Sequence, residues 1–423
     1  MSETTKTGEP PRRIRIHHPE TSAISEGFDP ALSVMAARPP IYPVSTYCFR
    51  NAAEAKQFFD MALGRIATPP GASQELIYAR LNNPNAEMFE SALVPLERGA
   101  AVAASFASGM SAITTCFLTF LRPGDVVLFT RPIYGGTDHV LNHMLEPFGI
   151  RARGVDAGSI DALAAEAERL GDSLALVYLE TPANPTLRMT EIAGAAAVAH
   201  ERPHRRRALL AVDNTFLGPL FQSPLEHGAD LVLYSATKYI GGHSDLVAGA
   251  VLARDPALVE EMKKVRSFFG TICEPFTAWL LERSLATIYT RMVKQSKNAL
   301  RIVERLRGHP KLRRIYYPTL ADGEQRRVYE KQCTAPGGMI SFEIAGGQAA
   351  AFRFLDSLKI AKLAVSLGSV ESLVTHPRTT TSSEMEPEEM ERVGISDGLV
   401  RFSTGVEYWR DLAEDIEQAL ERA

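Results

Sequence analysis

One lysine, Lys238, stands between an apolar run and a glycine-rich turn in the segment LVLYSATKYIGG, residues 231–242. The apolar run has the length and composition of a buried strand, so a lysine just beyond it is placed to lose contact with water. Desolvation lowers the pKa of a lysine and makes its neutral, nucleophilic amine more available, as Schiff-base chemistry with an aldehyde requires. A lysine that ends a strand and points into solvent fits this segment equally well.

A second candidate group, Asp213, follows the apolar run ALLAV. If the two runs are neighbouring strands, Asp213 and Lys238 can face the same ligand across the carboxyl end of a sheet. A buried aspartate beside a pyridine nitrogen would keep that nitrogen protonated and make the ring a better electron sink. Taken alone, an aspartate that caps the next loop is the more ordinary interpretation.

A third candidate is FASGMSAI, residues 106–113, in which small residues and a glycine precede an apolar helical run. Exposed backbone N–H groups at such a helix start can bind a phosphate. A plain helix cap is the alternative. Ser108 also suggests a hydrolase nucleophile, but no G-x-S-x-G motif surrounds it.

The elements that must position these groups follow an α/β pattern between about residues 77 and 273. Strand-like runs alternate with helical stretches such as SIDALAAEAERLG, which favours a largely parallel sheet covered by helices. The strand-like runs are Val126–Phe129, Ala175–Leu179, Leu209–Val212 and Leu231–Tyr234. We expect an N-terminal arm over 1–75, a large domain over 76–275 and a smaller α+β domain over 276–423, the last beginning with one long helical stretch at 278–308.

The N-terminal arm divides into two parts. Residues 1 to about 30 are polar and favour a mobile segment, and PPIYPVSTYCF, residues 39–49, indicates an extended strap. The adjacent His17 and His18 are weak support for a metal site, and we expect no metal.

Composition narrows the functional classes. The chain has 423 residues, of which 45% are hydrophobic and 23% charged, and its formal net charge is −4. That balance gives no broad reason to bind nucleic acid or an anionic membrane, so small-molecule ligands are the expected partners. The four cysteines are far apart in sequence, and no secretory signal or membrane-length apolar run is visible, which favours the cytoplasm.

Together and in this order, the motifs resemble the pyridoxal-phosphate enzymes of cysteine and methionine metabolism. This family includes cystathionine γ-synthase, cystathionine γ-lyase and methionine γ-lyase. The resemblance runs from about Pro39 to the end of the chain. Its most specific segment is YSATKYIGGHSDLVAGA, supported by YARLNNPN, ASGMSAI, ETPANPT, VDNTF, SLGSVESLVTHP and GISDGLVRFSTG. It implies the aminotransferase-like fold-type I: a mostly parallel seven-stranded sheet sandwiched by helices, with the smaller α+β domain following it.

The resemblance also implies roles for individual residues around the cofactor, pyridoxal 5′-phosphate. Lys238 would hold it covalently and move protons, Asp213 would pair with the ring nitrogen, and Tyr134 would stack on the ring and serve in acid/base chemistry near the leaving group. Asn184 would contact the ring's oxygen substituent. The phosphate would be held by Ser108, Gly109, Met110, Ser235 and Thr237.

Other matched positions concern the substrate and the oligomer. Arg401 is matched to the arginine that grips the substrate α-carboxylate, and Ser366 would assist it. Tyr78 and Arg80 are matched to residues that reach the phosphate of a neighbouring subunit. The resemblance therefore implies a homodimer as the smallest active unit and a homotetramer as its assembly.

The family members share this machinery, so the choice of reaction depends on other positions. Val365 stands where many cystathionine-handling members are acidic, which favours γ-elimination from a γ-substituted amino acid, in the manner of methionine γ-lyase or cystathionine γ-lyase. Gly136 replaces a cysteine associated with methionine γ-lyase, and the polar RTTTSSEM (378–385) suggests an oxygen-linked leaving group, as in canavanine, or a plain solvated loop. Asn85 stands where the family usually has threonine. A γ-replacement enzyme, namely cystathionine γ-synthase or an O-acyl-homoserine sulfhydrylase, and a catalytically inactive ligand-binding protein on the same fold remain the alternatives.

Overall fold

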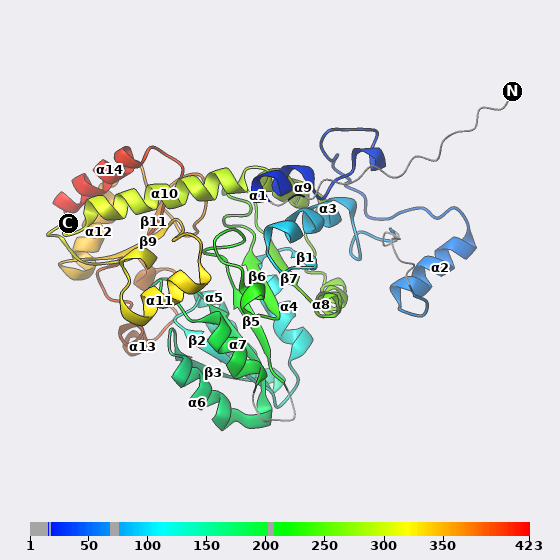
Figure 1. The fold of residues 1–423 in the computed structure, drawn as a ribbon, viewed down its shortest axis with the longest axis horizontal. Helices are drawn as coiled ribbons and strands as arrows, with labels where there is room; N and C mark the ends of the chain where they lie inside the picture. Colours follow the sequence, from blue (N-terminus) through cyan, green and yellow to red (C-terminus); the bar gives the residue numbers. More distant parts are fainter. Residues whose placement is uncertain (1–15, 17, 68–75, 202–206) are drawn as a thin grey trace.

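The structure is a computed structural model that describes residues 16, 18–67, 76–201 and 207–423 (Figure 1). Its centre is a seven-stranded sheet in the order β1-β7-β6-β5-β4-β2-β3. The strand β7 runs antiparallel to β1 and β6, and the other pairs are parallel. The strands are β1 Val102–Phe106, β2 Val126–Arg131, β3 Arg151–Asp156, β4 Leu174–Glu180, β5 Leu209–Asp213, β6 Leu231–Ser235 and β7 Gly249–Ala253.

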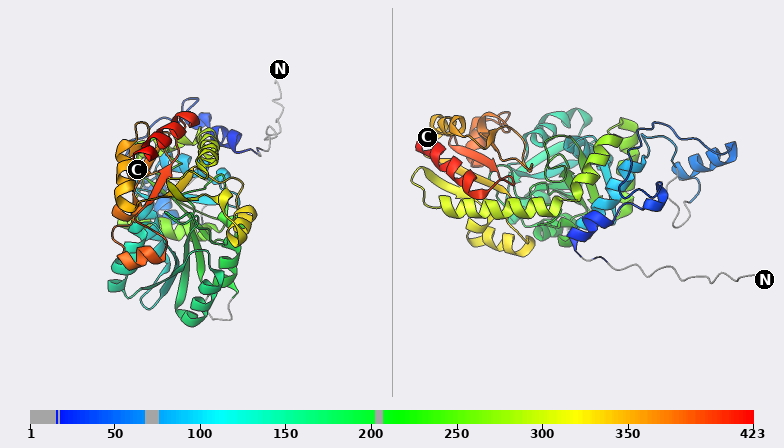
Figure 2. Two further views of the ribbon diagram at one scale, coloured as in Figure 1. Left: turned by 90° about the vertical axis from the view of Figure 1, so that its left-hand side faces the viewer. Right: turned by 90° about the horizontal axis from the view of Figure 1, so that it is seen from above.

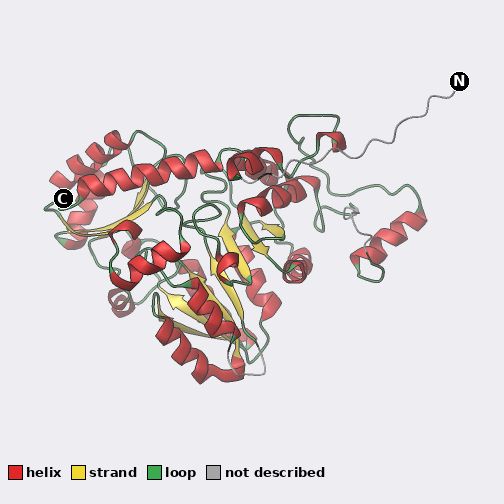
Figure 3. Ribbon diagram, viewed as in Figure 1, coloured by secondary structure: helices red, strands yellow, loops and turns green. Residues whose placement is uncertain are grey.

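Helices cover both faces of this sheet (Figure 3), and alternating side chains give it a core on each face. Leu176 and Tyr178 of β4 share one cluster with α4 and α8, whereas Val177 and Leu179 share the other with α6 and α7. Strands buried on both faces read as nearly continuous apolar runs, which is why four of them could be located from the sequence. The covering helices are α4 Gly109–Phe120, α6 Ile160–Leu170, α7 Ile192–His200 and α8 Pro256–Phe269, with the short α5 Gly135–His139 beyond β2. The predicted sandwich is confirmed.

A second sheet of five strands, in the order β10-β11-β12-β9-β8, forms the smaller α+β part. Its strands are β8 Leu312–Tyr316, β9 Met339–Ile344, β10 Lys362–Leu363, β11 Leu373–Thr375 and β12 Leu399–Ser403. Helices α10 Ile288–Leu306, α12 Gly347–Ser357 and α14 Trp409–Glu421 share its apolar core, with α11 Gly323–Gln332 and α13 Pro387–Arg392 at its borders. Figure 1 shows α10 extending from this part towards α9 and the large sheet.

The prediction of one long helical stretch at 278–308 is wrong in one respect, because the structure has two helices in this region, α9 Pro275–Leu285 and α10. The Ser284 carbonyl, near the end of α9, accepts bonds from the Thr287 N–H and from the Arg291 guanidinium, which closes the first helix. Leu285 and Ile288 are both fully buried on either side of this turn. The apolar pattern therefore continues across the break and conceals it.

The N-terminal segment is more ordered than its polar sequence indicated. Helix α1, Pro19–Ser25, contacts α10, so the expectation of a mobile arm is wrong for this part, while residues 1–15 and 17 lie outside the described residues. The strap at 39–49 has no regular structure beyond a bridge between Thr46 and Tyr78. It leads to α2, Ala52–Ala62, which stands apart from the rest in Figures 1 and 2.

Asn85 holds the strap in place. Its side chain accepts from the Tyr42 N–H at 2.7 Å and donates to the Pro40 carbonyl at 2.8 Å. The residue is almost fully buried at the start of α3, Pro84–Leu93. A threonine would have to accept and donate through a single hydroxyl oxygen on a shorter side chain, whereas asparagine uses separate oxygen and nitrogen atoms for the two backbone groups.

Among the described residues, no helix is long and apolar enough to cross a membrane.

Candidate active site

Lys238 lies in the turn that follows β6, and its ammonium group is turned into the protein. Nζ donates a hydrogen bond to Ser366 Oγ at 2.8 Å. Burial lowers the pKa of Lys238 to about 8, and the nearby Arg401 charge acts in the same direction, while Asp213 opposes it. The desolvated lysine considered from the sequence is therefore present, and the solvent-facing alternative is not.

Asp213 ends β5 and is buried. Its Oδ1 accepts from the Thr215 N–H at 3.0 Å, whereas Oδ2 receives only a long bond, 3.4 Å, from the Tyr178 hydroxyl. Burial raises the pKa of Asp213, and the hydrogen bonds from Thr215 and Tyr178 and the Lys238 charge oppose this only in part. One oxygen of this buried group is thus weakly satisfied, and a cationic N–H donor would suit it.

Arg401 is the contribution of the smaller domain to the group around Lys238. It lies on β12, is buried, and donates from Nη1 to Asn184 Oδ1 at 2.8 Å and from Nη2 to the Ser366 carbonyl at 3.0 Å. Burial lowers its pKa to about 10, which leaves the guanidinium charged at neutral pH. Lys238, Ser366, Arg401 and Asn184 thus form one connected hydrogen-bonded group.

Ser366 occupies an unusual backbone conformation, with φ at +91°. Non-glycine residues at positive φ are strained, and such strain persists where the surroundings fix the residue. Here the hydroxyl accepts from Lys238 while the carbonyl accepts from Arg401. Val365, immediately before it, is 59% exposed.

Tyr134 precedes α5, and its side chain is 44% exposed. Gly136 makes room for the ring, since a Cβ there would lie 2.7 Å from a Tyr134 ring carbon and 3.2 Å from the Met110 sulfur. The glycine at the position that we associated with cysteine therefore has a local steric consequence. A side chain at 136 requires the Tyr134 ring to move.

The predicted phosphate residues meet at the start of α4. The Ser108 hydroxyl caps this helix by accepting from the Ser111 N–H, and Thr237 Oγ1 exchanges hydrogen bonds with the Ala248 backbone. Both hydroxyls thus have structural partners. Gly109 lies so close to Ser235 that an added Cβ would be 2.9 Å from the serine Cβ. The N–H groups of Gly109 and Met110 are in the first turn, where no helical carbonyl is available to them.

The structure does not bring Tyr78 and Arg80 into this group. Arg80 donates to the Ser267 carbonyl at the end of α8, and its guanidinium lies 5.7 Å from the centre of the Tyr78 ring. The Tyr78 side chain is 44% exposed. Within one chain, among the described residues, neither forms a hydrogen bond or ion pair with Lys238, Asp213 or Arg401.

The segment 378–385 packs on the turn that carries Tyr134. The Thr381 carbonyl lies 2.4 Å from where a Cβ on Gly135 would stand, and Glu384 pairs with His139 of α5. Arg378 is engaged elsewhere, by Glu391 and Asp397, each at 2.8 Å. The segment therefore neighbours Tyr134, but its arginine is already paired.

Glu180 is a site residue that sequence reasoning missed. It ends β4 in register with Asp213, is almost fully buried, and accepts from the backbone N–H groups of Tyr134 and Asn184, both at 2.8 Å. The signal was present in ETPANPT, where the glutamate ends a wholly apolar run as Asp213 does.

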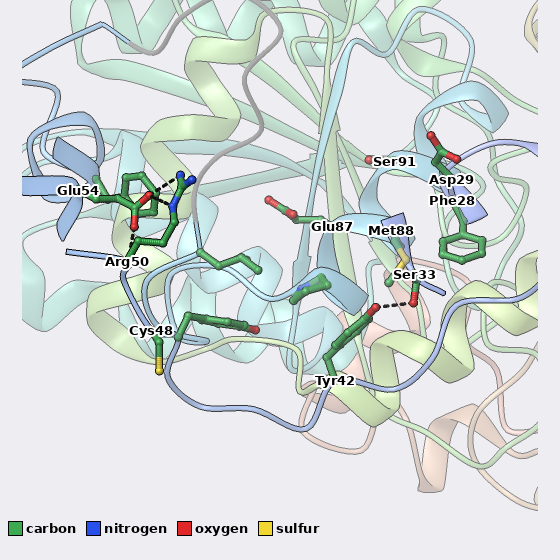
Figure 4. Close-up of a pocket in the computed structure, with 15 residues that line it drawn as sticks. Phe28, Asp29, Ser33, Tyr42, Cys48, Arg50, Glu54, Glu87, Met88 and Ser91 are labelled. Atoms are coloured by element: carbon green, nitrogen blue, oxygen red, sulfur yellow. Dashed lines mark hydrogen bonds and ion pairs between the residues drawn. The ribbon is translucent and has the colours of Figure 1, made fainter. Parts of the chain in front are cut away.

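A cavity of about 660 Å³ lies away from this group, between the N-terminal segment and α3 (Figure 4). In Figure 4, Tyr42 contacts Ser33 on one side and Arg50 contacts Glu54 on the other. None of its lining residues belongs to the predicted site. The chemistry and this cavity are therefore separate features of the chain.

Comparisons with known proteins agree on one family. The family model described as Cys/Met metabolism PLP-dependent enzyme matches residues 20–421. L-methionine γ-lyase of Pseudomonas putida is 39% identical over 402 residues, covering 95% of this chain and 96% of that protein. Cystathionine γ-lyase of Dictyostelium discoideum is 36% identical, covering 91% and 99%. The crystal structure of cystathionine γ-synthase from Xanthomonas oryzae pv. oryzae in complex with cystathionine superposes with a TM-score of 0.87 at 36% identity, covering 96% and 99%.

Proposed function

Because this chain belongs to the Cys/Met metabolism PLP-dependent enzyme family, we propose that it is a γ-lyase for a γ-substituted L-amino acid such as methionine or cystathionine. The observation that carries the proposal is the connected group Lys238–Ser366–Arg401–Asn184 beside the carboxyl ends of β4 and β6. In this group a nucleophilic amine and a carboxylate-binding guanidinium are both hydrogen-bonded to Ser366. A catalytically inactive binding protein has no need for a lysine whose pKa is lowered in this way.

The residues fit the family's cofactor, pyridoxal 5′-phosphate. Asp213 offers an under-satisfied carboxylate to the ring nitrogen, Lys238 an amine to the aldehyde, and the first turn of α4 a set of N–H groups to the phosphate. When bound, this cofactor supplies an electron sink that stabilises negative charge at the substrate α-carbon. Tyr134 and Asn184 border the same space and would contact the ring.

Each remaining step falls to a residue of the chain. The Arg401 guanidinium would bind the substrate α-carboxylate as a bidentate pair. Lys238 Nζ, once released by the substrate amine, would remove the α-proton, give that proton up to the cofactor and, as a neutral amine again, remove a β-proton, which prepares departure of the group on the γ-carbon. Tyr134 would then stand near the leaving group as a proton donor.

Val365 supports elimination over replacement. Its aliphatic side chain stands directly before the serine that contacts Lys238. Among the substrates of a γ-lyase, valine favours one with a small apolar end, such as methionine, because the second charged end of cystathionine gains no ion pair from it. The γ-synthase likeness at a TM-score of 0.87 favours γ-replacement as the second candidate.

We further propose that the active unit is a homodimer within a homotetramer, located in the cytoplasm. Tyr78 and Arg80 lie apart from their own chain's Lys238, which suits a contribution to the phosphate site of a neighbouring subunit through the 1–75 arm and the turn after it. The four cysteines are unpaired and suit a reducing compartment.

A substrate panel tests the reaction. Purified protein should show a visible absorption band of a covalently bound cofactor and should release 2-oxobutanoate and ammonia from methionine or cystathionine without a thiol acceptor. Turnover of O-acetylhomoserine or O-succinylhomoserine only with a thiol acceptor would replace γ-elimination by γ-replacement. Homoserine from canavanine would indicate an oxygen-linked leaving group. A protein without the band, even after addition of the cofactor, would not be an enzyme of this kind.

A further inference from the structure

Glu180 is a buried carboxylate that the proposed reaction does not use. It ends β4, with 5% of its surface exposed, and faces Asp213 of β5 in the strand register. Two carboxylates on neighbouring strands repel one another, and burial alone already disfavours their charges. Burial and the Asp213 charge raise the pKa of Glu180 to about 8, against the opposing effects of the hydrogen bonds from the Tyr134 and Asn184 backbones and of the Arg401 charge. Because this burial is unfavourable, we looked for interactions of Glu180 that offset it.

The two oxygens of Glu180 hold two different loops. Oε2 accepts from the N–H of Tyr134, in the turn between β2 and α5, and Oε1 accepts from the N–H of Asn184, in the loop after β4. Both distances are 2.8 Å, within the range of well-formed N–H···O hydrogen bonds. A single side chain thus fixes the spacing between the loop that carries the ring-stacking tyrosine and the loop that carries the asparagine.

The connection continues into the smaller domain. Asn184 Oδ1 accepts from Arg401, and Arg401 also donates to the carbonyl of Ser366, whose hydroxyl accepts from Lys238. A displacement of the Asn184 backbone would therefore move the partner that orients the guanidinium. The position of the substrate carboxylate depends in this way on a group that does not contact it.

We propose that Glu180 is a positioning residue that fixes Tyr134 and the Asn184–Arg401 pair as one unit, so that the ring face and the carboxylate site keep their relative geometry. The inference deepens the proposed function and rests on it. A merely structural role predicts a loss of stability after substitution, without a selective change at the two loops.

Glu97 provides a matched control for that alternative. It is equally buried, its pKa is raised well above the usual value by burial, and its Oε2 accepts from the Tyr234 hydroxyl. Among the described residues it forms no hydrogen bond to Tyr134, Asn184 or Arg401. Glu180→Gln and Glu97→Gln each exchange one buried carboxylate for an amide of nearly the same shape.

The test compares amide hydrogen exchange and steady-state kinetics in the two holoenzymes. The side-chain nitrogen that Glu180→Gln introduces cannot accept a hydrogen bond, so this variant loses at least one of the two N–H bonds. We expect exchange in the peptides spanning 132–138 or 181–190 to accelerate about tenfold or more. The substrate KM should rise about fivefold or more with a smaller change in kcat, because carboxylate binding is affected most.

Glu97→Gln should leave exchange in these peptides and the substrate KM unchanged. Equal behaviour of the two variants in exchange and KM would overturn the proposal. Glu180→Asp keeps the carboxyl group, with its two acceptor oxygens, at a shorter reach and should give intermediate values, and it replaces the glutamine variant if that one does not fold. A wild-type protein without a cofactor band would refute the proposed function, whereas the exchange comparison of the two loops can be read in either case.

Discussion

The candidate site has two borders of different construction. The carboxyl edge of the large sheet presents Glu180 and Asp213 at the ends of β4 and β5, and Lys238 in the turn after β6, and backbone ladders fix the register of these strands. The second border, 378–385, has only the short η8 turn, Pro377–Thr379. It is held by close approach to Gly135, by the ion pairs of Arg378 and Glu384 and by side-chain hydrogen bonds of Thr379 and Thr380. Chemistry that all members of the family share requires the rigid sheet edge. The choice of leaving group can vary at the segment 378–385 without disturbing that edge.

The first border should be the more sensitive to substitution. Removal of the amine in Lys238→Ala eliminates both the covalent attachment and the proton transfers, so turnover should fall about a thousandfold or more. After borohydride reduction, mass spectrometry should no longer find the cofactor attached to the protein. Lys264→Ala, which removes an exposed lysine paired with Glu261, is the control and should keep full activity. Cofactor still fixed to the Lys238→Ala protein would contradict the assignment.

The pH dependence of cofactor capture tests the burial of the same lysine. Only the neutral amine reacts, and the pKa of Lys238 is lowered to about 8, chiefly by burial and then by Arg401. When cofactor is added to protein from which it has been removed, the capture rate should rise about tenfold per pH unit below pH 8 and level off above it. Arg401→Gln removes the second cause and should move this plateau to higher pH. A rate that rises without a plateau to about pH 10 would indicate an ordinary, solvent-exposed lysine.

The difference between the borders also explains what the sequence could predict. Asp213 and Lys238 follow buried strands that read as apolar runs, so their common edge was foreseeable from strand adjacency. Glu180 follows the same pattern, but its partners are the backbone N–H groups of two separate loops, which no sequence motif marks. The pairing of Arg378 with Glu391 and Asp397 could not be foreseen, since it depends on where α13 lies. The break between α9 and α10 could not be predicted either, because the residues on both sides of the turn are buried and the apolar pattern continues through it.

Gly135→Ala should disturb the second border alone. A Cβ at this position would lie 2.4 Å from the Thr381 carbonyl, so the backbone of 378–385 must move away. We expect a loss of about 1–3 kcal/mol in the free energy of unfolding and a severalfold change in the ratio of kcat/KM between methionine and cystathionine. The cofactor absorption band should stay as it is in the unsubstituted protein. A lost band with an unchanged substrate ratio would mean that this segment supports the cofactor and not the substrate.

The smallest effect is expected for Glu384→Gln, which removes the ion pair with His139. The His139 and Glu384 side chains are 43% and 68% exposed, and exposed pairs contribute about 0–1 kcal/mol, so kcat/KM should change less than about twofold.

Glu389→Gln is the matched control, because Glu389 lies on α13, is less exposed and binds both Arg131 and Arg392. Because the Glu389 side chain ties α13 to the end of β2, Glu389→Gln should lower the free energy of unfolding by about 1 kcal/mol, measured by chemical denaturation. If Glu384→Gln instead changed the substrate ratio more than Gly135→Ala does, side chains of 378–385 would select the leaving group directly. The backbone contact with Gly135 would then be secondary.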